Sequence, residues 1–183
     1  GEREGSPYFW GDVARSKVKY HRAWYVNDLN TLAVNPSMPY HDPARPYARY
    51  WHTVTEAGDA RRFLSQLAPD RLERLKQEHG ASILYTHLGF GFYDSTRSAF
   101  VEPFVRIMTG LVQDTNAWIV PASELLDRLL LFKRVGAEHQ GGKLRLQNSN
   151  EIAVPFVTVL AVSGRANPDD IVCPGGCAVR QVR

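Results

Sequence analysis

The hydrophobic and polar positions divide the chain into three regions with different patterns. Residues 1–55 are rich in aromatic side chains and prolines, which disfavour long helices; a strand or two is predicted within residues 17–26 and an irregular loop over residues 35–52. Residues 56–136 alternate helical and extended patterns, whereas residues 137–183 carry turns and strand-like alternation. We therefore expect an irregular segment with short strands, an α/β region and a β appendage, in that order.

The central region predicts helices separated by short strands. Leucines or other apolar residues recur at helical spacing in four segments, at residues 56–67, 69–79, 104–111 and 124–135. Two short apolar runs, residues 82–86 and 117–120, predict strands between them. Alternation of helices and strands with short connections is typical of parallel strands joined by crossovers, so the expected fold class is α/β.

The C-terminal region predicts a small antiparallel β appendage. Residues 143–147 alternate, residues 153–163 are rich in valine, and residues 178–182 can add a final strand. The chain has two cysteines, Cys173 and Cys177, separated by a Pro-Gly-Gly turn. A disulfide there would close a loop of about five residues, worth about 2 kcal/mol in the chain-entropy model. The sequence leaves their redox state open.

Composition excludes several classes of protein. Among 183 residues, 44% are hydrophobic and 22% are charged, as in an ordinary globular domain. The formal net charge of +3 is spread along the chain, so nucleic-acid binding is not indicated. Apolar runs fall far short of the roughly 20 residues that a membrane-spanning helix needs, so no membrane span is expected.

A histidine occupies the most informative position in the chain. His87 follows the apolar run 82–86 at the point where glycines begin. In α/β folds the carboxyl ends of strands are where ligands bind. A histidine there can give or take a proton near neutral pH. The alternative is a structural histidine bonded to a neighbouring loop carbonyl.

Residues 80–87, Gly-Ala-Ser-Ile-Leu-Tyr-Thr-His, resemble a late motif of polysaccharide deacetylases, in which an apolar strand delivers a histidine to the active site. The segments 100–112, 118–120 and 121–127 resemble the closing elements of that family, so the resemblance covers about residues 60–135. It implies a partial (β/α) barrel that hydrolyses acetyl groups on a glycan. The implied machinery is a divalent metal such as zinc, an aspartate base and His87 as the acid. An envelope or extracellular location also follows from the resemblance.

The family's metal-binding motifs, an early aspartate pair before glycine and two histidines one helical turn apart, do not occur in this sequence. His41 and His52 are candidate replacement ligands, the alternative being solvated or hydrogen-bonded loop histidines. Asp28 is a candidate catalytic carboxylate that orients a histidine, or it simply forms a turn. Arg45, followed by proline, is similar to an Arg-Pro motif that the family uses near its base.

Four aromatic residues are candidates for a sugar-binding groove, since aromatic rings suit the apolar faces of pyranoses, although core packing explains them equally well: Tyr85, Phe90, Tyr93 and Trp118. Two functions stay open. One is deacetylation of an acetylated glycan with metal ligands supplied elsewhere or improvised locally. The other is a noncatalytic glycan-binding or structural module. An incomplete barrel has open sheet edges, which predicts self-association or a partner chain.

Overall fold

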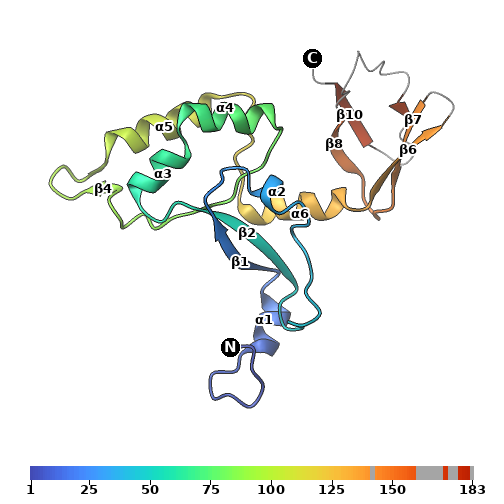
Figure 1. Ribbon diagram of the computed structural model, residues 1–183, viewed down its shortest axis with the longest axis horizontal. Helices are drawn as coiled ribbons and strands as arrows, with labels where there is room; N and C mark the ends of the chain where they lie inside the picture. Colours follow the sequence, from blue (N-terminus) through green and yellow to red (C-terminus); the bar gives the residue numbers. More distant parts are fainter. Residues whose placement is uncertain (141–142, 160–170, 173–176, 182–183) are drawn as a thin grey trace. The chain divides into compact units, whose positions relative to one another are not determined.

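A three-stranded parallel sheet organises the first of two units into which the chain divides, Gly1–Ser123 and Glu124–Arg183 (Figure 1). The computed structural model describes residues 1–140, 143–159, 171–172 and 177–181. Over these residues the protein is a mixed α/β chain with six helices, which confirms the predicted class. The described strands form small sheets and no closed barrel.

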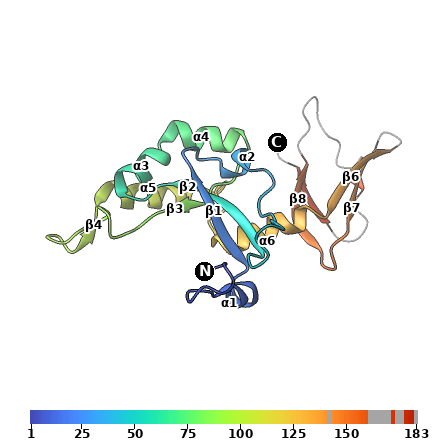
Figure 2. The same cartoon turned by 60° about the horizontal axis from the view of Figure 1, so that its bottom comes forward.

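The sheet of the first unit has the strand order β1–β2–β3 (Figure 2). These strands are Tyr20–Val26, Tyr50–Glu56 and Leu84–Tyr85, and both pairings are parallel. Parallel strands were expected, and β1 and β3 lie within the segments predicted as strands, residues 17–26 and 82–86. In contrast, β2 begins in the predicted loop and crosses the expected boundary at residue 55. The loop expected over residues 35–52 therefore ends before Tyr50.

Helices α3 and α4, at Ala60–Gln66 and Pro69–Gln77, follow the sheet strand β2. The first begins four residues later than predicted, because Asp59 caps it by accepting a hydrogen bond from the Arg62 amide. Pro69 opens the next in its first turn, as expected. A third, α5, spans Glu102–Gln113.

Two shorter helices, α1 at Gly11–Lys17 and α2 at Thr31–Val34, flank β1. The strand predicted at residues 117–120 is wrong: the segment forms no strand, and Trp118 and Ile119 are 52% and 53% exposed. None of the described helices is long and apolar enough to cross a membrane.

The core of the first unit lies on one side of the sheet, where α3, α4 and α5 gather (Figure 1). Leu84 of β3 packs against this core, together with apolar residues that the helical spacing had marked: Leu72, Leu75, Phe104, Ile107, Met108 and Leu111. The rings of Phe63, Phe92 and Phe104 meet edge-to-face with centroids 5.1–5.6 Å apart. A hairpin of β4, Tyr93–Asp94, and β5, Ala99–Phe100, follows Phe92.

The second unit contains most of α6, Ala122–Phe132, and two small sheets. Strands β6, Val135–Gln140, and β7, Lys143–Asn148, form an antiparallel hairpin. The strand at residues 143–147 and the antiparallel pairing were predicted, whereas no strand was predicted at β6. The antiparallel prediction is wrong for the other pairs, because β9, Ile171–Val172, runs parallel to β7, and β10, Cys177–Gln181, runs parallel to β8, Val154–Val159. Long connections between the paired strands allow the crossovers that parallel pairing requires. Cys173 lies outside the described residues.

Candidate functional site

Hydrogen bonds to a buried threonine hydroxyl and between backbone groups hold the short strand β3 in the parallel sheet. The Thr31 hydroxyl donates to the carbonyl of Ala81 (3.0 Å) and accepts from the amide of Ile83 (3.2 Å). The Ile83 carbonyl accepts from the amide of Thr55, 2.7 Å away, and the Tyr85 carbonyl accepts from that of Ala57. The two-residue strand β3 is therefore fixed on both sides, and the residues that follow it are positioned by that anchoring.

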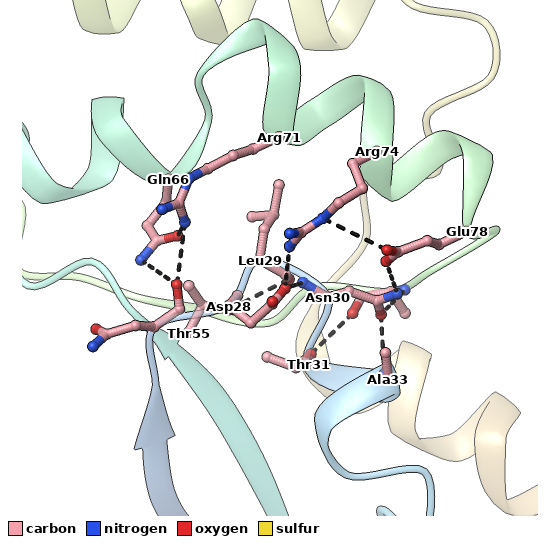
Figure 3. Close-up of polar contacts among 12 residues, drawn as sticks. Asp28, Leu29, Asn30, Thr31, Ala33, Thr55, Gln66, Arg71, Arg74 and Glu78 are labelled. Carbon is pink, nitrogen blue, oxygen red and sulfur yellow. Dashed lines mark hydrogen bonds and ion pairs between the residues drawn. The ribbon is translucent and has the colours of Figure 1, made fainter.

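Asp28 forms a turn at the end of β1 (Figure 3). One of its carboxylate oxygens accepts from the amide of Asn30 at 2.9 Å and from the guanidinium of Arg74 at 2.6 Å. Neither contact involves a histidine. The geometry thus agrees with the turn-forming interpretation of Asp28, and the Arg74 pair ties β1 to α4.

The same network satisfies the polar groups of the loop around Asn30 (Figure 3). The buried Asn30 amide oxygen accepts from the backbone amides of Ala33 and Ala81, and its nitrogen donates to Glu78 at 2.8 Å. Nearby, the side-chain amide of Gln66 donates to the carbonyl oxygens at the ends of β1 and β2. Because its polar groups bond to other groups of the protein, we interpret this network as structural and not as a ligand site.

A second group of side chains at this end of the sheet is exposed or half-buried. We call it the aromatic–arginine cluster, and it consists of Arg22, Tyr25, Tyr85, His87 and Phe90. The guanidinium carbon of Arg22 lies 4.1 Å from the ring centre of Tyr85 and 4.7 Å from that of Tyr25, and the two rings are 5.1 Å apart. The His87 ring contacts both Tyr85 (4.8 Å) and Phe90 (5.3 Å). Tyr25 is 44% exposed and Phe90 61%.

A β-bulge in β1 brings Arg22 and Tyr25 to the same face. Arg22 pairs with His52 and Tyr25 with Val54, so β1 uses three residue steps where β2 uses two. In a regular strand, residues three apart point to opposite faces. The extra residue reverses that relation and allows the guanidinium to stack on the tyrosine.

His87 is exposed, and its ring nitrogen Nε2 lies 2.5 Å from the hydroxyl of Tyr85. When the ring proton sits on Nδ1 alone, Tyr85 donates to Nε2; when Nε2 carries a proton, this nitrogen donates to the hydroxyl oxygen. The side-chain contact is therefore with a tyrosine and not with the loop carbonyl of the alternative interpretation. The His87 backbone amide does bond a loop carbonyl, that of Gly58, at 3.3 Å.

The charge of this cluster is centred on Arg22. Desolvation raises the pKa of Tyr25, and a hydrogen bond with Tyr85 acts in the same direction, while Arg22 opposes them. Tyr25 therefore keeps its proton at neutral pH and can donate a hydrogen bond. Burial lowers the pKa of the neighbouring His52, and the charge of Arg22 lowers it further, so His52 is neutral at pH 7.

The two candidate metal ligands lie at and near β2. The Nδ1 atom of His41 lies 3.2 Å from the carbonyl oxygen of Arg49, and His52 is half-buried with its Nδ1 unpartnered. In the part of the chain that the structure describes, no three histidine, cysteine, aspartate or glutamate side chains group closely enough to hold a metal ion. These residues do not by themselves form a metal centre.

Two of the predicted substrate-binding residues, Arg45 and Tyr93, make their contacts outside the cluster. Arg45 pairs with Glu2 at 2.9 Å and stacks on Trp51 at 3.7 Å. Tyr93 packs against Phe100 in the β4–β5 hairpin, and Trp118 lies in the connection between α5 and α6.

Of the predicted residues, the structure brings Tyr85, His87 and Phe90 together. Sequence reasoning missed Arg22 and Tyr25, although both lie in a segment expected to hold a strand. The register of β1 would have placed them on one face, but the bulge changes the usual alternation of the strand, so the sequence pattern does not indicate this register. Comparison of the chain with protein-family models, curated proteins and solved structures gives no match.

Proposed function

We propose that the chain binds a glycan through the aromatic–arginine cluster. The observation that carries the proposal is the exposed set of stacked rings at the carboxyl end of a parallel sheet, around Arg22, Tyr25 and Phe90. Exposed ring faces suit the apolar faces of sugar rings, and the Tyr25 hydroxyl, the imidazole of His87 and the guanidinium supply hydrogen bonds for sugar hydroxyls.

The resemblance of residues 60–135 to polysaccharide deacetylases supports the choice of a glycan. On this proposal the first unit is an incomplete barrel of the deacetylase type, the ligand is an acetylated glycan, and the protein works in the envelope or outside the cell. The open edge of β1, which pairs with β2 alone among the described strands, supports self-association. Light scattering that finds only monomers over a tenfold concentration range would refute that association.

Binding is tested by titrating an acetylated chitooligosaccharide into the full chain by calorimetry or NMR. We expect Tyr25→Ala to weaken binding about tenfold or more, because the variant loses a stacking ring and a hydroxyl. Tyr8→Ala is the matched control, since Tyr8 is 79% exposed and lies outside the cluster. Equal affinity of both variants and the parent chain, or no binding at all, would refute the proposal.

A second candidate function is hydrolysis of the acetyl group, with His87 as the general acid. The exposed position of His87 beyond β3 favours it, because the protonated ring can keep its Nε2 bond to Tyr85 and give its Nδ1 proton to the leaving group, becoming a neutral imidazole. The metal would need ligands beyond those the described residues bring together. The test is acetate release by the purified chain with and without zinc, compared with His87→Ala. Metal-free protein with no release under either condition would exclude this activity for the chain.

A further inference from the structure

Arg22 contacts aromatic rings and has no acidic partner among the described residues. Among the described residues, no carboxylate lies within 4.0 Å of its guanidinium, and its contacts are with two tyrosine rings. Three other arginines of the first unit are instead paired with carboxylates at 2.6–3.2 Å: Arg45 with Glu2, Arg62 with Glu56 and Arg74 with Asp28. The charge of Arg22 is therefore left uncompensated at an exposed position.

The carboxylate of Glu56, which acts on Tyr25 of the cluster, already has two hydrogen-bond donors. Glu56 is close enough to influence Tyr25, but its Oε1 accepts from the Arg62 guanidinium at 3.2 Å and from the Gly58 amide at 3.1 Å. His52 is neutral because its burial lowers its pKa. A single guanidinium thus sets the charge of this part of the surface.

Stacking also prepares Arg22 for one kind of ligand. A guanidinium packed over aromatic rings keeps its N–H donors in the plane of the group, where they match the two oxygens of a carboxylate. The rings hold the group in place, so less freedom is lost when a ligand binds. Another exposed ring of the cluster, that of Phe90, contacts His87.

We infer that the preferred ligand is an acidic oligosaccharide, whose uronic-acid carboxylate binds Arg22 while a sugar ring stacks on Tyr25 or Phe90. This inference rests on the proposed glycan binding and adds the charge of the sugar to it. The positive, unpaired guanidinium supplies the charge complementarity, and the tyrosine rings supply the platform.

The experiment compares an oligogalacturonate with its methyl ester, which has the same sugar rings without the negative charge. We expect the acid to bind the parent chain about tenfold or more tightly than the ester, and this preference to fall at high salt. Arg22→Gln should abolish the preference, and Arg22→Lys should reduce it because a lysine cannot bind bidentately. Arg61→Gln, at an exposed arginine of α3, removes the same charge and should leave the preference unchanged.

The outcomes distinguish a failure of the preference for acidic sugars from a failure of glycan binding. If the ester and a neutral chitooligosaccharide bind as tightly as the acid, and Tyr25→Ala weakens them all, glycan binding stands and the preference for acid is refuted. If none of the sugars binds, both fail. If glutarate binds as tightly as the oligogalacturonate, the site recognises a bare carboxylate and the sugar assignment is overturned. The acid-to-ester comparison uses the parent chain, so it decides the matter even where a variant does not fold.

Discussion

The hydroxyl of Thr31 offers a direct test of how the short strand β3 is held. Thr31 is fully buried, and its hydroxyl bridges the carbonyl of Ala81 and the amide of Ile83. Thr31→Val replaces the hydroxyl by a methyl group of nearly the same size, so it removes both hydrogen bonds without opening a cavity. It also leaves the Ile83 amide without its partner, while the Ala81 carbonyl still accepts from the Leu32 amide at 3.2 Å.

The expected loss follows from these two bonds. Each hydrogen bond contributes about 1 kcal/mol net, and leaving the buried Ile83 amide unsatisfied adds to the cost, so Thr31→Val should lower the free energy of unfolding by about 2–4 kcal/mol. Thr31→Ser keeps the hydroxyl and removes one methyl group, which costs about 1 kcal/mol. The valine variant should therefore be the less stable of the two, although it is the more hydrophobic.

Urea unfolding followed by tryptophan fluorescence measures this difference in the first unit alone, because all four tryptophans lie there. Thr109→Val, at an exposed position of α5, is the matched control and should change stability by less than about 0.5 kcal/mol. Hydrogen exchange adds a local readout: the Ile83 amide should exchange faster in Thr31→Val and keep its protection in Thr31→Ser. A valine variant as stable as the serine variant would refute the bridging role.

Three further predictions concern the core and the pH dependence of stability. Phe92→Ala, at a fully buried ring, should cost about 3–5 kcal/mol in urea unfolding, whereas Tyr93→Ala next to it, half exposed, should cost far less; equal losses would contradict the core assignment. Burial lowers the pKa of His52 below 6.5, so its contribution is present above that value and lost as pH falls through the folded-state pKa. His52→Gln should flatten the fall in stability between about pH 7 and 5 in unfolding titrations, and an unchanged slope would count against it. A hydrogen bond from Lys76 lowers the pKa of Asp114 below 3.8, so Asp114→Asn should destabilise the chain at pH 7 and have little effect below the folded-state pKa; the same loss at both pH values would exclude the pair as its cause.

Local patterns in the sequence predicted the helices better than the sheet. The helices α4 and α5 follow from apolar residues three and four positions apart, a signal contained within each segment. A strand depends on a partner elsewhere in the chain, and that explains two of the errors at strands. Residues 117–120 have the composition of a strand but pair with no other strand, whereas β2 pairs on both sides although its sequence mixes Trp51 with polar residues.

In the candidate site, too, the sequence predicted residues that lie in one segment and missed those that come from other segments. His87 and Tyr85 belong to one segment, and their position beyond a strand could be inferred from the glycines that follow. Arg22 joins them only because β1 lies two strands away in the same sheet, which no local pattern records. Asp28 was found by its position after β1, but the arginine that occupies it comes from α4, forty-six residues later.

The bulge in β1 has a consequence for how this strand tolerates changes in length. Arg22 and Tyr25 share a face with two residues between them, and they would also share it with one residue between them in a regular strand. Removal of Ala23 or Trp24 would therefore restore an unbroken ladder and leave the guanidinium and the tyrosine on the same side. Elsewhere in β1 a one-residue deletion would turn the following side chains to the opposite face. Related chains that differ in length by one residue at this position would keep the same surface.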